Sequence, residues 1–226
     1  MGVVALHKRT HTCLKQSAAA MARYLEDMLH PDGDISFFND SAVGIAPDPK
    51  ATLDYAHELG LDWSPGAGPL CHHADSGYIV ARCHNQVMLM DVAPVGPDYQ
   101  PGHTHADTLS FEWSVYGQRV LVNSGTSLYD VSDERLWQRG TAAHNTVAIN
   151  GENSSEFWGG FRVARRARPF NVQTEQSNEM VVVRAAHDGY HRLRPKVTHH
   201  REWRIAPGSL DTVSYTHLTL PTILLV

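Results

Sequence analysis

The chain opens with helical hydrophobic patterns and then changes to short alternating runs. Apolar side chains recur every three or four residues from Cys13 to Leu29, in a segment rich in Ala, Leu and Met, which predicts an amphipathic helix. A second helix is expected from Asp48-Pro49 to Gly60, because proline favours the first turn of a helix and glycine its end. The later runs are short, apolar or alternating, and Gly and Asn turns separate them. This pattern predicts an antiparallel β-sandwich.

The predicted fold class is therefore α+β with more than one domain. The helices fall in residues 1–65 and the sandwich in residues 66–213. Two helices alone cannot bury both faces, so the helical part is expected to be the end of a larger unit. Residues 214–226 are Thr-rich, apolar and uncharged; they form either an edge strand or a tail foreign to the native protein, and we assign them no function. The expected strands are YIVARCH, VMLMDVA, TLSFEWSVY, RVLVNSG, NTVAING, FRVARRARPFNVQ, MVVVRAA and THHREWRIA.

Composition excludes several classes of partner and cofactor. The 226 residues carry 19 Lys and Arg against 24 Asp and Glu, a formal net charge of -5, so no basic footprint for nucleic acid is present. No apolar run is long enough for a membrane span, and the first residues lack the apolar core and cleavage site of a secretory signal. Cys13, Cys71 and Cys83 form no CxxC pair, which indicates neither a disulfide framework nor a thiolate zinc site.

Histidine carries the strongest chemical signal. In the segment HTHAD, His103 and His105 lie two residues apart directly before an expected strand, with Asp107 close by. Alternate side chains of an extended chain point the same way, so both imidazoles can face one site. Zn²⁺ takes three or four such ligands, and Asn123 and His144, at the ends of other expected strands, are further candidates. The competing interpretation is that these are structural or surface histidines.

Other histidine patterns are weaker. His72-His73 and His199-His200 are adjacent pairs whose members face opposite sides of a strand, so we interpret them as structural or exposed. The HxHxDH motif of metallo-β-lactamase-type hydrolases fails because Thr108 follows the aspartate, and Glu112 lies too far along for a cupin.

Two longer segments, HTHADTLSFEWSVYGQRVLVNSGTSLYD and RLWQRGTAAHNTVAINGENSSEFWGGFRVARRARP, resemble the heparinase II/III-like polysaccharide lyases. The resemblance runs from about Phe37 to about Leu210. It implies an (α/α) toroid followed by an antiparallel β-sandwich, with the leading helices as the last helices of an incomplete toroid.

The resemblance also implies a structural Zn²⁺ site. His105 and His144 match histidine ligands of the family, and Asn123 stands where the family usually has an aspartate ligand. The amide oxygen of Asn123 can coordinate, but without a charge it should hold the ion more weakly.

For the substrate cleft, the resemblance implies that His103 faces an acidic polysaccharide. Tyr129 lies near the place of a cleft tyrosine, and Arg139 is a candidate for a bidentate contact with a uronate carboxylate. Among the aromatic residues, Trp137 and Trp158 lie in loop-like segments where they could face a glycan, whereas Trp113 and Trp203 lie inside strand patterns and are expected in the core. The run RVARRAR is either a solvated strand face or a strip that binds a polyanion.

The activity that the resemblance implies is β-elimination on a uronic-acid polysaccharide, in the bacterial periplasm or outside the cell. A base removes the proton on C5 and an acid protonates the leaving oxygen. Because most of these groups come from the toroid in the family, this chain alone is expected to be inactive. The alternative is a non-catalytic, zinc-stabilised glycan-binding or accessory protein of envelope polysaccharide synthesis. A metal-dependent hydrolase would need a further acidic ligand or base, which the sequence lacks.

Overall fold

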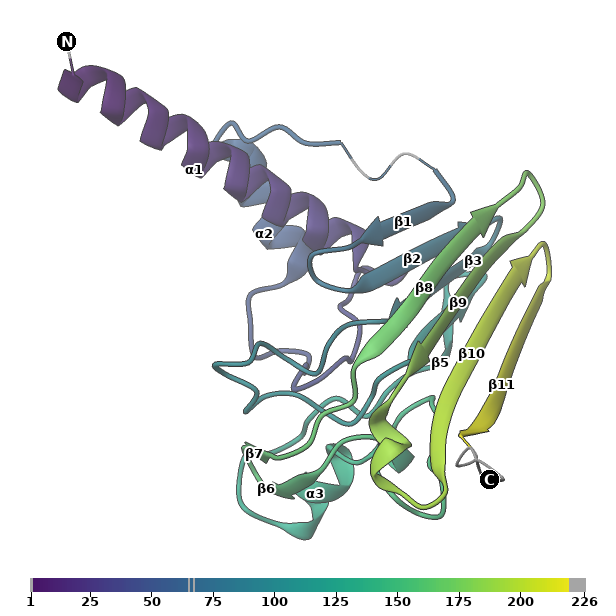
Figure 1. The fold of residues 1–226 in the computed structure, drawn as a ribbon. Helices are drawn as coiled ribbons and strands as arrows, with labels where there is room; N and C mark the ends of the chain where they lie inside the picture. Colours follow the sequence, from purple (N-terminus) through teal and green to yellow (C-terminus); the bar gives the residue numbers. More distant parts are fainter. Residues whose placement is uncertain (1, 65, 67, 220–226) are drawn as a thin grey trace.

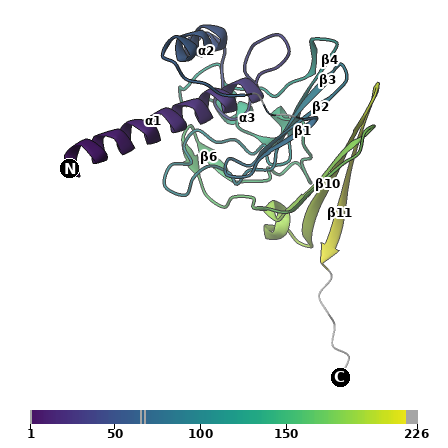
Figure 2. The same ribbon diagram turned by 90° about the horizontal axis from the view of Figure 1, so that it is seen from above.

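The computed structural model describes residues 2–64, 66 and 68–219, which form helices on one side of two stacked sheets (Figures 1 and 2). Helix α1 spans Gly2–Asp27 and helix α2 spans Pro49–Glu58, so both predicted helices are confirmed. The carboxylate of Asp48 caps α2 by accepting the Ala51 N–H at 3.1 Å, as its position before proline leads one to expect. None of the described helices is long and apolar enough to cross a membrane.

The first sheet is an antiparallel meander of five strands in chain order. Each pair of neighbours is consecutive in sequence. Short turns connect most of them, whereas the long segment of residues 92–110, which contains the HTHAD motif, joins β3 to β4. Its strands are β1 (Leu70–His73), β2 (Tyr78–Cys83), β3 (Gln86–Asp91), β4 (Phe111–Val115) and β5 (Gln118–Leu121).

The second sheet has four antiparallel strands in the order β11-β10-β9-β8 and faces the first (Figure 2). The predicted sandwich is therefore confirmed. The edge strand β11 pairs with β10 along its whole length, so residues 214–219 continue the sheet. The strands are β8 (Pro169–Gln176), β9 (Val181–His187), β10 (Lys196–Ala206) and β11 (Ser209–Thr219).

The main core lies between the two sheets. Ile79 and Met88 of the first sheet and Val183 and Trp203 of the second are fully buried in one cluster, which confirms the core position predicted for Trp203. Trp113 is partly buried against the same cluster, also as predicted.

The outer face of the first sheet is covered by the end of α1. Met28 and Phe38 pack against Val80 and Leu89, which point away from the main core. Strands β2 and β3 are consequently buried on both faces, and this explains why their sequences are almost continuously apolar. The described residues contain one further α-helix, the short α3 (Asp133–Gln138), and no toroid is evident in them.

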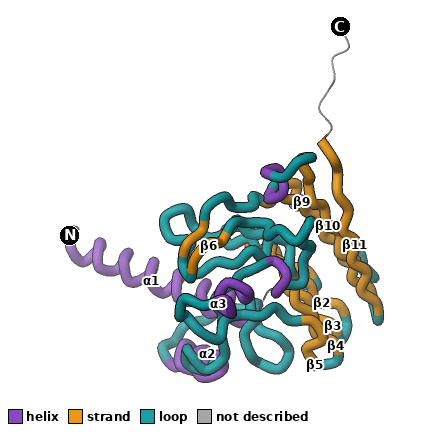
Figure 3. Tube along the Cα trace, turned by 90° about the horizontal axis from the view of Figure 1, so that it is seen from below, coloured by secondary structure: helices purple, strands orange, loops and turns teal. Residues whose placement is uncertain are grey.

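Three segments differ from the sequence-based expectation. Residues 145–151 do not form a strand, because the Asn145 side chain instead donates to the carbonyls of Phe111 and Val122, both at 2.9 Å. The strand expected over 161–173 divides into β7 (Arg162–Val163), which pairs with β6 (Phe157–Gly159), and β8. Helix α3 occupies a segment expected to be a loop. The irregular chain between these elements gathers beside the sheets, together with α3 and β6 (Figure 3).

Candidate functional site

One carboxylate, that of Asp40, joins the histidine motif to the loop between α1 and α2. Its Oδ2 accepts from His103 Nδ1 at 2.9 Å, and its Oδ1 accepts from His105 Nε2 at 2.8 Å. The guanidinium of Arg135, on α3, binds both oxygens, with Nη2 at 2.7 Å from Oδ2. The two imidazoles thus converge on one group, although the segment that carries them is a loop and not a strand.

The electrostatics of this cluster keep Asp40 ionised. Burial alone would raise its pKa, but hydrogen bonds from His105, Arg135 and His103 hold the pKa well below its usual range. Because an ionised carboxylate only accepts hydrogen bonds, Nδ1 of His103 carries the proton of this contact, and in the neutral imidazole the lone pair is on Nε2. The His103 side chain is 55% exposed, so that lone pair is available to a ligand.

His103 opens into a hollow of about 490 Å³ between the end of α1 and the sandwich. The residues that line it include Tyr24 of α1, Met28 just after α1, Asp40 and Tyr129. The rings of His103 and Tyr129 lie edge to face with centroids 5.9 Å apart. Tyr129 is half-exposed, so the structure brings together the histidine and the tyrosine that sequence reasoning assigned to the cleft.

His105 also faces a third imidazole, that of His144, and both of these rings are buried. His105 Nδ1 and His144 Nε2 face each other at 3.2 Å, close to the spacing of about 3.3 Å between two nitrogen ligands of tetrahedral zinc. Burial lowers the pKa of His144 to about 4, although the charge of Asp107 partly opposes this, so the ring is in the neutral form that binds metals. Its buried Nδ1 has no hydrogen-bond partner among the described residues.

Asn123, the third expected ligand, is buried beside this pair. Its Oδ1 accepts the N–H of Asn145, the neighbour of His144, at 3.2 Å. Glu112 accepts the backbone N–H groups of Asn123 at 3.0 Å and of Phe37 at 2.8 Å, and its other oxygen lies 2.7 Å from His30 Nε2. Two imidazole nitrogens at this spacing match a pair of zinc ligands. Asn123 offers an amide oxygen as the third expected ligand, and Glu112 fixes its backbone.

Arg139 is a correction to the sequence-based assignment. Its guanidinium is fully buried and donates to the carbonyl of Thr104 at 3.0 and 2.8 Å and to that of Gly159 at 2.7 Å. It also lies over the ring of Phe157. A uronate carboxylate cannot reach it. Arg139 instead holds the residue between His103 and His105 in place.

The two candidate sugar-stacking residues lie on the surface. Trp137 and Trp158 are each exposed, and Arg162 lies 4.9 Å from the centre of the Trp158 ring. No described contact joins either of them to the hollow at His103. In the arginine run, Arg165 pairs with Glu156. An exposed ion pair of this kind is typical of the solvated face of a strand.

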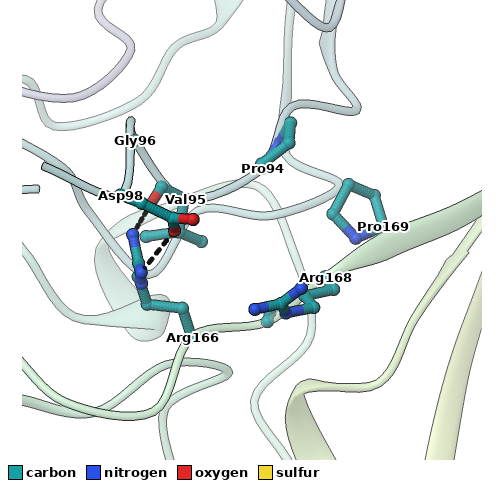
Figure 4. Close-up of a pocket in the computed structure, with 8 residues that line it drawn as sticks. Pro94, Val95, Gly96, Asp98, Arg166, Arg168 and Pro169 are labelled. Carbon is teal, nitrogen blue, oxygen red and sulfur yellow. Dashed lines mark hydrogen bonds and ion pairs between the residues drawn. The ribbon is translucent and has the colours of Figure 1, made fainter.

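Further hollows extend from the one at His103. A second, of about 500 Å³, shares His103 and Tyr78 with the first and reaches Gly96. A third, of about 430 Å³, shares Gly96 with the second and is lined by Arg166 and Arg168 (Figure 4). Arg166 donates to Asp98, a well exposed partner, at 2.6 Å. The hollows therefore form a series that starts at His103 and ends at two arginines.

Sequence reasoning missed Asp40 and Arg135. Asp40 stood in the segment FFND, which the resemblance covered, but no nearby residue marked it as functional. Arg135 has a signal in retrospect: Ser132 followed by two acidic residues is typical of a helix start, and its hydroxyl accepts the Arg135 N–H at 3.2 Å. A separate group able to hold a metal, Asp27, Cys71 and His73, lies where α1 meets β1.

Comparison with known families identifies the domain. The sequence model described as heparinase II/III-like, C-terminal, matches residues 66–213. The chain belongs to this family. The resemblance expected from the HTHAD and TAAHNT segments is thus confirmed, and the heparinase II/III-like domain begins just before β1. No curated protein matches the sequence.

Solved structures agree on the fold of this heparinase II/III-like chain. Heparinase III is similar with a TM-score of 0.70 and 18% identity, over 92% of this chain and 34% of that one. A mutant of heparan sulfate lyase HepC from Pedobacter heparinus gives a TM-score of 0.60 and 18% identity, over 85% and 31%. The heparinase III-BT4657 gene product gives 0.62 and 17%, over 86% and 31%. The chain spans about a third of the length of these structures.

Proposed function

We propose that this chain is the C-terminal part of a polysaccharide lyase that cleaves a uronic-acid-containing polysaccharide by β-elimination. The observation that carries the proposal is the pairing of ionised Asp40 with half-exposed His103, in a hollow shared with Tyr129. Membership of the heparinase II/III-like family supports the same reaction. Residues 1–65, including α1 and α2, then belong to the last part of a toroid, and the enzyme acts in the periplasm or outside the cell.

His103 and Tyr129 supply proton-transfer groups to this cleft. The Asp40 carboxylate holds the proton of His103 on Nδ1, so Nε2 can accept a proton from a sugar carbon or hydroxyl. As Nε2 takes up a proton, the imidazolium gains an attractive interaction with Asp40. The phenol of Tyr129, beside His103, can donate a proton to a leaving oxygen. In this proposal the group that neutralises the uronate carboxylate is on the toroid, because Arg139 is buried.

His105, His144 and Asn123 would hold the zinc ion that the family implies. When bound, the ion would be structural and would cross-link the loop that carries His103 to the segment after α3. Asp40 fixes the tautomer of His105 by accepting from Nε2, which leaves Nδ1 free to coordinate. Asp40 thus contacts both His103 and His105.

The row of hollows favours an acidic polysaccharide as the partner. It runs from His103 past Gly96 and ends at Arg166 and Arg168. The Arg168 side chain forms no ion pair within the described part of the chain, so it is available to a carboxylate or sulfate. Trp137 and Trp158 would add stacking surfaces outside this row.

The test uses the parent full-length protein with His103→Ala beside His105→Ala. Heparan sulfate, heparin and alginate are the probes, and the unsaturated uronate product is followed by its near-ultraviolet absorbance. His103→Ala should abolish cleavage while keeping about one zinc per chain at the sandwich and an unchanged melting temperature. His105→Ala should lose that zinc and lower the melting temperature.

Two results would overturn the proposal. Undiminished cleavage by His103→Ala would remove the histidine from the reaction, and a full metal load in His105→Ala would remove the zinc site. If the wild-type protein bound these polysaccharides at the row of hollows without cleaving any, the glycan-binding or accessory function would replace the lyase.

A further inference from the structure

A second group of metal-binding side chains lies where the end of α1 meets the edge strand β1. Asp27, the last residue of α1, is buried, and Cys71 and His73 lie two residues apart on β1 and so on the same side of it. Asp27 Oδ2 is 3.4 Å from His73 Nε2 and 3.7 Å from Cys71 Sγ, and the latter two atoms are 3.5 Å apart. One oxygen, one nitrogen and one sulfur therefore form a nearly equilateral triangle.

Hydrogen bonds account poorly for all three sides of this triangle. The carboxylate only accepts, so His73 Nε2 must carry a proton to bind Asp27. In that state it cannot accept from the thiol of Cys71, and the third side is left to one N–H shared with the weakly accepting sulfur. A cation between the three atoms binds all of them at once.

The dimensions of the triangle match those of zinc. With bond lengths of about 2.3 Å to sulfur, about 2.0–2.1 Å to nitrogen and about 2.0–2.2 Å to oxygen, ligands at tetrahedral angles lie about 3.3 to 3.6 Å apart. The three observed distances fall within about 0.2 Å of that range. Sulfur and imidazole ligands together favour zinc over calcium or magnesium.

Gly66 borders the cluster on one side, and the partly exposed His73 borders it on another. The N–H of Gly66 donates to Asp27 Oδ1 at 3.2 Å. A Cβ at Gly66 would lie 3.2 and 3.3 Å from the two carboxylate oxygens and 3.5 Å from Cys71 Sγ, so any other residue would crowd the cluster. His73 is 17% exposed, and water can therefore reach a fourth position.

The positive charges nearby are compatible with a cation. Arg23 Nε lies 3.7 Å from Asp27 Oδ2, but its side chain is half-exposed and can turn into solvent. Arg82 contacts the other carboxylate oxygen at 3.9 Å and donates to the Asp27 backbone carbonyl. Burial lowers the pKa of His73, which favours its neutral, ligating form. Burial and Asp27 raise the pKa of Cys71, so an ion would displace the thiol proton.

We propose that Asp27, Cys71 and His73 bind one zinc ion, with water as the fourth ligand, and that the ion clamps the end of α1 to the first strand of the sandwich. The sequence did not indicate this site. Its one cysteine, Cys71, is not part of a CxxC motif, and Asp27 lies more than forty residues before the strand that carries Cys71 and His73. The proposal is independent of the lyase reaction and of the site at His105.

Cobalt distinguishes this site from the other, because only this one contains sulfur. Metal-free 226-residue chain titrated with Co²⁺ should develop a near-ultraviolet thiolate-to-cobalt charge-transfer band that saturates by two equivalents, because the site at His105 takes up the other ion. Cys71→Ser should abolish the band, and His73→Ala should weaken cobalt binding at least about tenfold. Cys13→Ser and His105→Ala, which leave the three ligands intact, should retain it. Zinc should raise the melting temperature of the wild type and of Arg23→Gln, and raise it less in Cys71→Ser.

The proposal fails if folded wild type, verified by circular dichroism, shows no charge-transfer band with two equivalents of cobalt, one for each proposed site. It also fails if the band persists in Cys71→Ser, because the sulfur ligand would then be another cysteine. Should His73→Ala not fold, His73→Gln serves in its place, and an unweakened band there would exclude the imidazole.

Discussion

Asp40→Asn is the most informative perturbation of the candidate site. The change keeps the shape of the side chain and removes its charge. Arg135, whose guanidinium is fully buried, then loses its only carboxylate partner among the described residues, and the N–H groups of His103 and His105 compete for one remaining amide oxygen. The perturbation therefore tests whether this carboxylate holds the site together.

The expected cost is about 3 kcal/mol of unfolding free energy. Leaving a buried charge without its partner costs about 3–5 kcal/mol, and the lower end applies because asparagine still accepts one hydrogen bond. That is a large part of the total stability of about 5–15 kcal/mol of a typical domain. The matched control is Asp32→Asn, in the same loop and also paired with an arginine, Arg119. There the carboxylate is 40% exposed, and the loss should stay below about 1 kcal/mol.

The assay is urea unfolding of the 226-residue chain, followed by circular dichroism at neutral and at acidic pH. Because the folded state lowers the pKa of Asp40, its contribution is present above the unfolded value of about 4 and is lost as the pH falls below it. Asp40→Asn should thus be least different from the wild type at the lowest pH. A loss within about 1 kcal/mol of that in Asp32→Asn at neutral pH would refute the reasoning.

Three further predictions concern residues outside the Asp40 cluster. Arg139→Met should lower the unfolding free energy by about 2–4 kcal/mol, because three buried hydrogen bonds to carbonyls are lost, and heparin affinity per folded molecule, measured by calorimetry, should stay the same. Burial, Arg201 and His200 lower the pKa of His199 to about 4. Because folded His199 binds a proton less readily than unfolded His199, the free energy of unfolding should rise by up to about 3 kcal/mol between pH 4 and 6.5. In urea titrations, the unfolding free energy of His199→Phe should depend less on pH than that of the wild type. Trp137→Ala and Trp158→Ala should weaken polysaccharide binding without changing the melting temperature, whereas Trp203→Ala should cost about 3–5 kcal/mol; an unchanged affinity in both surface variants would assign those rings no part in binding.

Local patterns were sufficient to predict the two leading helices and the sandwich, but not the short helix α3. The repeat near 3.6 residues between Cys13 and Leu29 and the repeat of two in the strands depend only on neighbouring residues. The strand predicted for the segment NTVAING was wrong. The Asn145 side chain there donates hydrogen bonds to the carbonyls of Phe111 and Val122, and nothing in the segment itself indicates these contacts. The strand expected over 161–173 was likewise wrong, since residues 164–168 leave the sheet before β8 begins.

The candidate site depends on contacts that no local pattern encodes. Asp40 binds His103 from 63 positions away and Arg135 from 95 positions away. Arg135 and Arg139 lie one helical turn apart. The fold places the Asp40 carboxylate beside Arg135 and backbone carbonyls beside Arg139. The sequence analysis assigned only Arg139 to the cleft, and that choice overlooked its burial.

The leading segment is part of the site and not an appendage to the family domain. Asp27 contacts Cys71 and His73, His30 contacts Glu112, and Asp40 contacts the histidine motif. In each case a residue from before position 66 completes a polar cluster whose other members lie in the sandwich. A chain that began at residue 66 would retain the expected zinc ligands His105, His144 and Asn123. It would lack Asp40, the carboxylate that sets the tautomers of His103 and His105. The family model begins at residue 66 and therefore leaves out part of the candidate site. The polar contacts that orient the histidines run from the helical segment to the sandwich.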